Sequence, residues 1–275
     1  MTDISRKLAL NKLNNTRDLG GIRTVDGRRI RCGRLFRSGQ LYFADEEDRR
    51  TLAQLHLRRI YDFRSGEERI EKPDPVIEGA ENLHLPVVRD LAAGITRDEN
   101  SDRKAVDEII GRSLSDPAYA VRYMSEMYDD LVQDSRSNFY YSRFLEDAAR
   151  TLCSVPGSAV LWHCTAGKDR AGFAAVLMLE ALGVDRAAIM EDYLSTNAYL
   201  AGEVGRLLTE IGTAQKLDSS GETAIRCLFG AREEYLDAAY RRVQIRWGSM
   251  DRFLQQGLGL TDSARQQLRE HLLEN

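Results

Sequence analysis

The segment from Cys164 to Arg170 gathers the side chains of this sequence that could do chemistry together. It reads Cys-Thr-Ala-Gly-Lys-Asp-Arg and follows the apolar stretch 158–162. The thiolate is the nucleophilic form of cysteine, and nearby cations or a helix N-terminus lower a thiol pKa from its free value of about 8.5. Lys168 and Arg170 supply such cations. The spacing therefore predicts a reactive thiol at Cys164.

The same segment has the composition of an anion-binding loop. An apolar strand that enters a Gly-rich turn before a helix directs several backbone N–H groups at one point, where the helix dipole adds positive potential. Gly167 can adopt the strained backbone that such a turn requires. Arg170 can bind two oxygens of a tetrahedral oxyanion through its planar guanidinium, and the Lys168 ammonium adds a looser charge at the rim. The predicted phosphate-binding residues are Thr165, Ala166, Gly167 and Lys168.

A thiolate beneath a bound phosphate is placed for in-line attack on phosphorus. The equatorial oxygens would stay on the loop amides and on Arg170, which stabilise the charge of the transition state. The product is a cysteinyl-phosphate that water later hydrolyses, so we expect two-step nucleophilic catalysis without a metal or a cofactor. A nucleotide-binding loop does not fit, because Asp169 follows Lys168 where that motif needs Ser or Thr.

The elements that must position this loop alternate between strands and helices in the first half of the chain. A hairpin is expected around the Asp26-Gly27 turn. An apolar helix, stopped by Gly183, is expected directly after the loop. Strands are expected at Ile60–Phe63, Glu81–Val88 and Ser158–Cys164, and an amphipathic helix at Ala44–Leu57.

The second half is richer in helix. Residues 90–117 are polar and lack a clear period, which predicts a loop or mobile lid. Residues 118–152 turn helical, and their many Tyr and Phe side chains are expected in the core. The C-terminal part is helical again. One helix is expected to end at Gly248, and a last helix is expected after an N-cap at Thr261 or Asp262. The sum is a mixed α/β sheet surrounded by helices, which we expect to form one domain over residues 1–275.

Composition excludes several classes of function. The chain has 275 residues and a net charge of −4, which argues against general nucleic-acid binding. No apolar run reaches the length of about 20 residues that a membrane span needs. The N-terminus lacks the apolar core of a signal peptide, so we expect a cytoplasmic protein or one secreted without such a signal. The four cysteines lie far apart, which favours free thiols over a zinc site or disulfides.

The loop, entered as His-Cys from an apolar strand, resembles the active-site loop of the protein tyrosine phosphatase superfamily. The strand, Gly167 and the apolar helix make the match specific, whereas a bare Cys-x5-Arg spacing is common by chance. The string Ala166–Arg170 is similar to the loop of an atypical bacterial family that acts on phosphotyrosine, and in some members on phosphoserine, phosphothreonine and phosphoinositides. Further stretches that agree are Asn15–Gly21, Gly33–Leu41, Tyr61–Arg69, Glu191–Asn197 and Gly248–Leu260.

This resemblance covers nearly the full chain and implies a fold and a proton donor. The implied fold is a phosphatase-type mixed central sheet flanked by helices, with extra helices forming a lid. Asp169 matches the position of an Asp within the family's loop, which implies that it is the general acid. Its alternative role is to cap the following helix. Asp62, at the end of a predicted strand, is a second candidate for the acid, although an acid in that place is more often structural.

One position departs from the superfamily pattern. Ser or Thr usually follows the loop arginine, where its hydroxyl stabilises the thiolate and helps the phosphoenzyme to break down. Ala171 stands there in this chain, and Thr165 offers a hydroxyl only from a different direction. The hypothesis is that slow hydrolysis of the cysteinyl-phosphate limits turnover.

Other charged residues near these motifs have less specific explanations. His163 could orient the loop and favour the thiolate, or it could be a strand-end histidine bonded to the main chain. Arg17 and Asp18 could touch the phosphate loop, but a buried ion pair that braces the sheet is the favoured interpretation. Arg37 and Arg64 end predicted strands and could face the substrate, although placement at the surface is the default expectation.

The favoured function is thus a phosphatase that uses a Cys nucleophile, an Arg phosphate clamp and an Asp acid. Its expected partners are phosphorylated proteins or phosphoinositides, and Lys168 would help to hold a second phosphate. The depth of the cup decides between phosphotyrosine and the shorter phosphoserine and phosphothreonine. The alternative is a catalytically weak module that binds phosphorylated partners.

Overall fold

The computed structural model of the chain describes residues 6–87, 103–214 and 217–275. A five-stranded sheet lies at the centre, in the order β1-β3-β6-β4-β5. Its strands are β1 (Arg17–Asp18), β3 (Leu35–Ser38), β4 (Leu57–Asp62), β5 (Glu81–His84) and β6 (Ala159–His163). The last four run parallel, and β1 pairs antiparallel with β3. The sheet is therefore mixed, as the sequence predicted.

A second, small sheet joins a strand of the N-terminal part to the C-terminal end of the chain. In it β2 (Arg29–Ile30) pairs antiparallel with β7 (Leu273–Glu274). The expected turn before β2 is present, because Gly27 has φ +90° and the Arg28 carbonyl accepts from the Thr24 amide at 2.9 Å.

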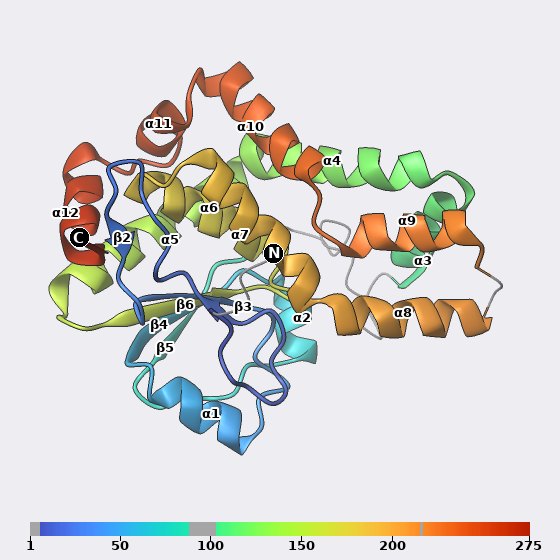
Figure 1. The fold of residues 1–275 in the computed structure, drawn as a ribbon, viewed down its shortest axis with the longest axis horizontal. Coiled ribbons are helices and arrows are strands. Elements are labelled where there is room, and N and C mark those ends of the chain that lie inside the picture. Colours follow the sequence, from blue (N-terminus) through green and yellow to red (C-terminus); the bar gives the residue numbers. More distant parts are fainter. Residues whose placement is uncertain (1–5, 88–102, 215–216) are drawn as a thin grey trace.

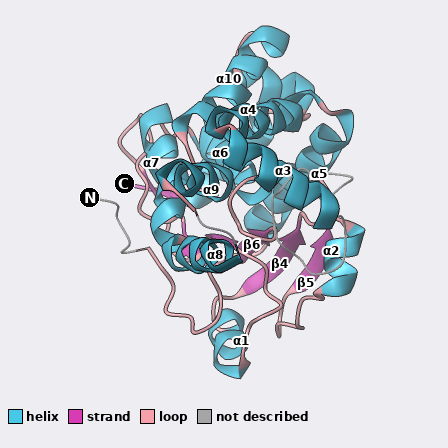
Figure 2. Cartoon of the chain, turned by 90° about the vertical axis from the view of Figure 1, so that its right-hand side faces the viewer, coloured by secondary structure: helices cyan, strands magenta, loops and turns pink. Residues whose placement is uncertain are grey.

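Helices cover both faces of the central sheet and extend beyond it (Figure 1). They are α1 (Glu46–Ala53), α2 (Gly66–Glu71), α3 (Arg103–Ser115), α4 (Pro117–Gln133), α5 (Ser135–Ser154), α6 (Arg170–Leu182), α7 (Arg186–Tyr199), α8 (Ala201–Ala214), α9 (Ser219–Phe229), α10 (Glu233–Trp247), α11 (Met250–Arg252), the π-helical turn η2 (Phe253–Gly257) and α12 (Asp262–Leu272). Figure 2 shows α10, α4 and α6 stacked on the side of the sheet opposite α1. Among the helices in the described part of the chain, none has the length together with the apolar composition that a membrane span requires.

The strand β6 shows why its sequence folds where it does. All five of its residues are buried. Ala159 and Leu161 belong to the smaller core, which α1 covers, whereas Val160 and Trp162 belong to the larger core under α5 and α6. A parallel strand buried on both faces reads as a continuous apolar run, which is the pattern that predicted it.

Most predicted elements are present, with shifted boundaries. The expected helix Ala44–Leu57 stops at Ala53, because His56 turns the chain with φ +54° and β4 begins at Leu57. The apolar helix α6 stops at Gly183 with φ +85°, and Thr261 caps α12 through the Ala264 amide, both as expected.

The prediction of a loop over residues 90–117 was wrong from Arg103 onward, where α3 begins. Ile109 and Ile110 are buried, and α3 packs against α4 and α9. Such a narrow apolar stripe in a polar helix is stabilised by tertiary packing rather than by a visible period. Residues 90–102 of that prediction lie outside the described part.

The aromatic residues of the second half largely lie in the core, as expected. Tyr128, Tyr141 and Phe144 are fully buried, whereas Phe139 is exposed. The larger core cluster runs from Leu19 to Leu273. One domain over residues 1–275 stays a prediction that this continuous core supports.

Candidate active site

The segment 164–170 connects the central strand β6 to the helix α6. It leaves the sheet at the carboxyl end of β6, where the parallel neighbours β3 and β4 also end. Ligand sites of such sheets form at this edge. Cys164 is the first residue after the strand and is 2% exposed.

Partners outside the loop hold its main-chain carbonyl groups. The Asn15 side-chain amide donates to the Ala166 carbonyl at 3.0 Å, and Arg37 Nη2 donates to the Gly167 carbonyl at 2.8 Å. The Thr165 carbonyl accepts from the backbone amide of Gln40 at 2.9 Å. In a trans peptide the next N–H points opposite to the carbonyl. The amides that follow these carbonyls therefore point into the loop, as an anion cradle requires.

Gly167 is required by both its backbone and its surroundings. Its φ is +67°, in the left-handed region that favours glycine. A Cβ at this position would lie 2.5 Å from the Ser38 carbonyl oxygen. The loop can pass this close to the end of β3 only with glycine here.

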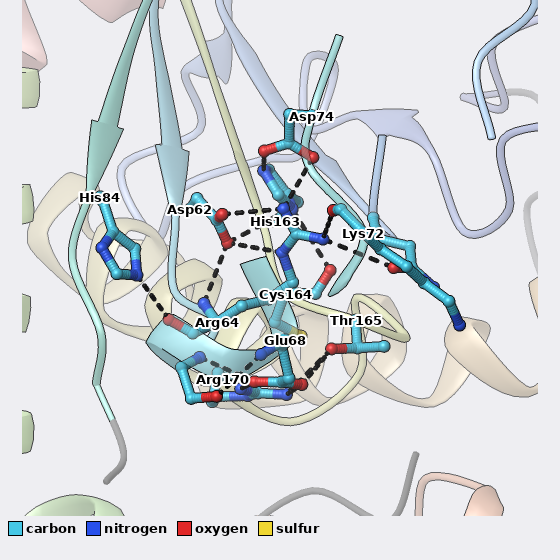
Figure 3. A network of polar contacts seen from close by, with 12 residues as sticks. Asp62, Arg64, Glu68, Lys72, Asp74, His84, His163, Cys164, Thr165 and Arg170 are labelled. Atoms are coloured by element: carbon cyan, nitrogen blue, oxygen red, sulfur yellow. Dashed lines mark hydrogen bonds and ion pairs between the residues drawn. The ribbon is translucent and has the colours of Figure 1, made fainter. Parts of the chain in front are cut away.

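Arg170 lies at the start of α6 and is held by an acid from another element (Figure 3). Its Nη1 and Nη2 donate to the Glu68 carboxylate at 2.6 and 2.9 Å. The Thr165 hydroxyl donates to the same carboxylate. Arg170 Nε is buried and has no hydrogen-bond partner among the described residues. A ligand bound in the loop could satisfy this N–H.

Glu68 is a site residue that the sequence analysis missed. It lies in α2 and is 1% exposed. It forms a capping box with Ser65, in which each side chain bonds the other's backbone amide. Burial alone would raise the pKa of Glu68, but Arg170 outweighs it and lowers this pKa to about 2. The Ser-x-x-Glu pattern could have predicted the cap, but not the contact with the loop.

Lys168 and Asp169 have hydrogen-bond partners in the helical half of the chain. Lys168 Nζ donates to the carbonyls of Leu228 at 2.7 Å and Gly230 at 3.3 Å, at the carboxyl end of α9. Asp169 occupies the N-cap position of α6 but makes no capping hydrogen bond, so the capping alternative is wrong. Its carboxylate instead accepts from the Tyr128 hydroxyl at 2.9 Å. The roles of Lys168 in phosphate binding and of Asp169 as acid stay predictions.

His163 lies fully buried behind the thiol, between two carboxylates (Figure 3). Its Nε2 is 3.0 Å from Asp74 Oδ2, and its Nδ1 is 3.9 Å from Asp62 Oδ1. Burial lowers the pKa of His163, but Asp74 and Asp62 outweigh burial, so the net shift is upward. The ring also lies 3.3 Å from the Cys164 carbonyl oxygen. The two carboxylates therefore favour the protonated form of His163, next to Cys164.

Arg64 links the same two carboxylates. Its Nη2 lies 2.9 Å from Asp62 Oδ2 and 2.9 Å from Asp74 Oδ1, and its side chain is 0% exposed. The expectation of surface placement was wrong for Arg64, because two buried acids neutralise it. Asp62, Asp74 and His163 could in geometry ligate a metal, but the guanidinium of Arg64 already occupies the carboxylates. Asp62 is thus engaged in a structural ion pair.

A second buried ion cluster braces the loop from the side of α7. Asp192 accepts from Arg17 Nε at 3.0 Å and from Arg37 Nη1 at 2.8 Å. Burial raises the pKa of Asp192, but the two guanidinium groups outweigh burial and hold it well below its usual value. Arg17 is therefore in a buried ion pair, as expected, but its partner is Asp192. Asp18 instead accepts from the backbone amides of Gly20 and Gly33.

Surface placement was also the wrong expectation for Arg37. It is 0% exposed and connects Asp192 to the Gly167 carbonyl.

Ala171, where the superfamily pattern has a hydroxyl, is fully buried, and its carbonyl accepts from the Trp162 indole at 3.0 Å.

The chain is similar to known proteins over nearly its whole length. A family model described as the tyrosine phosphatase family matches residues 8–274. The chain is 35% identical over 268 residues to an inferred tyrosine-protein phosphatase of Cupriavidus necator, covering 97% of this chain and 88% of that protein. It is 29% identical over 278 residues to the triple specificity protein phosphatase PtpB of Mycobacterium tuberculosis, covering 94% and 96%. A tyrosine-protein phosphatase of Nostoc commune is 26% identical over 171 residues, covering 61% and 49%.

Proposed function

Because this chain belongs to the tyrosine phosphatase family and is a phosphoric monoester hydrolase, we propose that it works through a cysteinyl-phosphate on Cys164. The thiolate attacks phosphorus as the P–O bond to the leaving group breaks. Water then hydrolyses the S–P bond and releases phosphate. The amides of the loop and Arg170 hold the phosphoryl oxygens throughout.

The observation that carries this proposal is the Arg170 guanidinium at the end of the loop. Its Nε is a buried N–H without a hydrogen-bond partner among the described residues, and the outside partners of the loop carbonyls turn the following amides inward. Glu68 occupies the other two nitrogens of the guanidinium, so it fixes which edge of Arg170 faces the loop. A tetrahedral oxyanion would satisfy these donors, since a phosphoryl group accepts from several N–H groups at once.

Asp169 is the acid of this proposal. It would give its proton to the leaving oxygen, which then departs as an alcohol or a phenol rather than as an anion. Two findings support this role: the carboxylate does not cap α6, and the rival Asp62 is bound to Arg64.

The proposed substrates are phosphotyrosine and, beyond it, phosphoserine, phosphothreonine and phosphoinositides. The similarity to a phosphatase named for triple specificity supports this breadth. Release of phosphate from matched phosphopeptides and from short-chain phosphoinositides would rank these substrates. Activity confined to phosphotyrosine would remove the broader claim.

Hydrolysis of p-nitrophenyl phosphate in the presence of EDTA tests the core of the proposal. We expect full activity with EDTA and none in Cys164→Ser, whereas Cys32→Ser, which changes an exposed thiol, should keep the activity. Residual hydrolysis by Cys164→Ser would contradict the proposal. Tight phosphopeptide binding without release by the wild-type protein would instead favour a binding module.

A further inference from the structure

The carboxylate of Asp169 is held by a side chain that the sequence analysis assigned only to the core. Tyr128 of α4 donates its hydroxyl proton to Asp169 Oδ1 at 2.9 Å. Lys168 Nζ lies 3.5 Å from the same oxygen. Both contacts involve Oδ1.

Tyr128 is itself the second link of a buried chain of donors. The Tyr193 hydroxyl, from α7, donates to the Tyr128 hydroxyl at 2.8 Å. The chain therefore joins two helices of the helical half, α4 and α7, to one oxygen of the loop.

The acceptor at its end gives this chain a fixed direction. Because Asp169 Oδ1 accepts, the Tyr128 proton turns toward it, and the Tyr128 oxygen is then open to accept the proton of Tyr193. Successive bonds of this kind polarise one another.

Both hydroxyls remain protonated and rigidly placed. Tyr128 is 0% exposed and Tyr193 is 1% exposed, and burial raises the pKa of each well above its usual value. The ring of Tyr128 packs edge-on against Tyr193 at 5.9 Å and lies 6.0 Å from the ring of Tyr235. Neither hydroxyl can therefore take the proton of Asp169.

We propose that Tyr128 is a positioning residue that keeps Asp169 Oδ1 as an acceptor and so reserves Oδ2 for the acid proton. This rests on the proposed function. As the S–P bond forms and the P–O bond breaks, the proton on Oδ2 moves to the leaving oxygen. The negative charge that remains on Asp169 is stabilised by the Tyr128 hydroxyl. Tyr128 thus acts on the acid, not on the phosphate.

The test compares two aryl phosphates that differ in how much their leaving group needs a proton. Phenyl phosphate has a poor leaving group, and 2,4-dinitrophenyl phosphate has a good one. We expect Tyr128→Phe to lower kcat/KM for phenyl phosphate about tenfold, the size of one hydrogen bond to a charged group. The loss for the dinitrophenyl ester should stay below about twofold, since that leaving group departs without a proton.

Tyr235→Phe is the matched control. Tyr235 is another buried tyrosine against the same ring, and its hydroxyl donates to the Cys227 carbonyl rather than to the chain. Tyr235→Phe should change kcat/KM for the two substrates by the same factor. Tyr193→Phe removes the hydroxyl that donates to Tyr128. It should lower kcat/KM for phenyl phosphate more than for the dinitrophenyl ester, as Tyr128→Phe does, but by a smaller factor. Inhibition by vanadate should be unchanged in Tyr128→Phe, which shows that the variant folds and that its phosphate loop is intact.

Asp169→Asn separates failure of this inference from failure of the proposed acid. If Asp169→Asn loses mainly phenyl phosphate hydrolysis while Tyr128→Phe loses both substrates equally, the positioning role is refuted and Asp169 remains the acid. If Asp169→Asn itself shows no dependence on the leaving group, Asp169 is not the acid, and the inference fails with it. In the supporting outcome, adding Tyr128→Phe to Asp169→Asn causes no further loss for phenyl phosphate.

Discussion

Glu68→Gln removes one negative charge from the buried centre of the site without changing the size of the side chain. Glu68 neutralises Arg170 through two charged hydrogen bonds and also accepts from the Thr165 hydroxyl. The glutamine can accept at one atom only, so Arg170 becomes a buried cation without a counter-charge. We expect lower stability and lower activity together.

The size of the effect follows from the pKa of Glu68. It falls from 4.5 to about 2, and each pKa unit corresponds to about 1.4 kcal/mol, which gives about 3 kcal/mol in favour of the carboxylate. Removal of one partner from a buried ion pair costs about 3–5 kcal/mol in other proteins. The free energy of unfolding of Glu68→Gln should therefore be about 3 kcal/mol lower at pH 7.

The pH dependence of this difference has a definite sign. The pKa of Glu68 is lower in the folded protein than in the unfolded chain, so its stabilisation is present above pH 4.5 and is lost as the pH falls toward about 2. Denaturant unfolding of both proteins at pH 7 and in acid measures this. The difference between wild type and Glu68→Gln should shrink in acid.

Glu67→Gln is the matched control, because Glu67 precedes Glu68 in α2 and is exposed. Surface changes of this kind stay within about 0.5 kcal/mol. The effect on catalysis is measured as kcat/KM for p-nitrophenyl phosphate. This value should fall at least about tenfold in Glu68→Gln, because the Glu68 carboxylate no longer holds Arg170 in place. If Glu68→Gln matches Glu67→Gln in stability and in activity, the reasoning is refuted.

Three further changes test other parts of the site. Gly167→Ala should weaken vanadate inhibition about tenfold or more, because φ is +67° and a Cβ would meet a carbonyl oxygen at 2.5 Å; unchanged inhibition would show that the loop tolerates a side chain. Asp74→Asn should destabilise the protein more below pH 6.5 than at about pH 9, since the raised pKa of His163 makes its stabilisation present in acid and lost as the pH rises; an equal loss at both pH values would argue against a charged His163. Ala171→Thr should raise steady-state turnover and reduce a pre-steady-state burst if hydrolysis of the phosphoenzyme is slow, and equal turnover of the two proteins would remove that hypothesis.

The loop could be predicted from sequence because its chemistry is local. The proposed nucleophile, the flexible glycine and the proposed phosphate-binding arginine lie within seven consecutive residues, and the strand before them is apolar up to its last residue, His163. Gly183, Gly248 and Thr261 end or begin helices through short-range geometry. Features of this kind depend on neighbouring residues only.

The residues that support the loop could not be predicted in the same way. Glu68 is 102 positions from Arg170, and Tyr128 is 41 positions from Asp169. Nothing in a single sequence links such partners, since the contact exists only after the sheet and the helices have packed. Arg37 and Arg64 were placed at the surface because charged residues are seldom fully buried. That rule fails where a buried acid lies opposite, as Asp192 and Asp74 do.

The most direct test of the central claim is to trap the phosphoenzyme. Wild-type protein is mixed with p-nitrophenyl phosphate, quenched in acid within the first turnover and digested for peptide mass mapping. The mechanism predicts a phosphoryl group on the peptide that contains Cys164, formed together with one equivalent of p-nitrophenol. An unmodified Cys164 during turnover, or a phosphoryl group on another residue, would contradict the account.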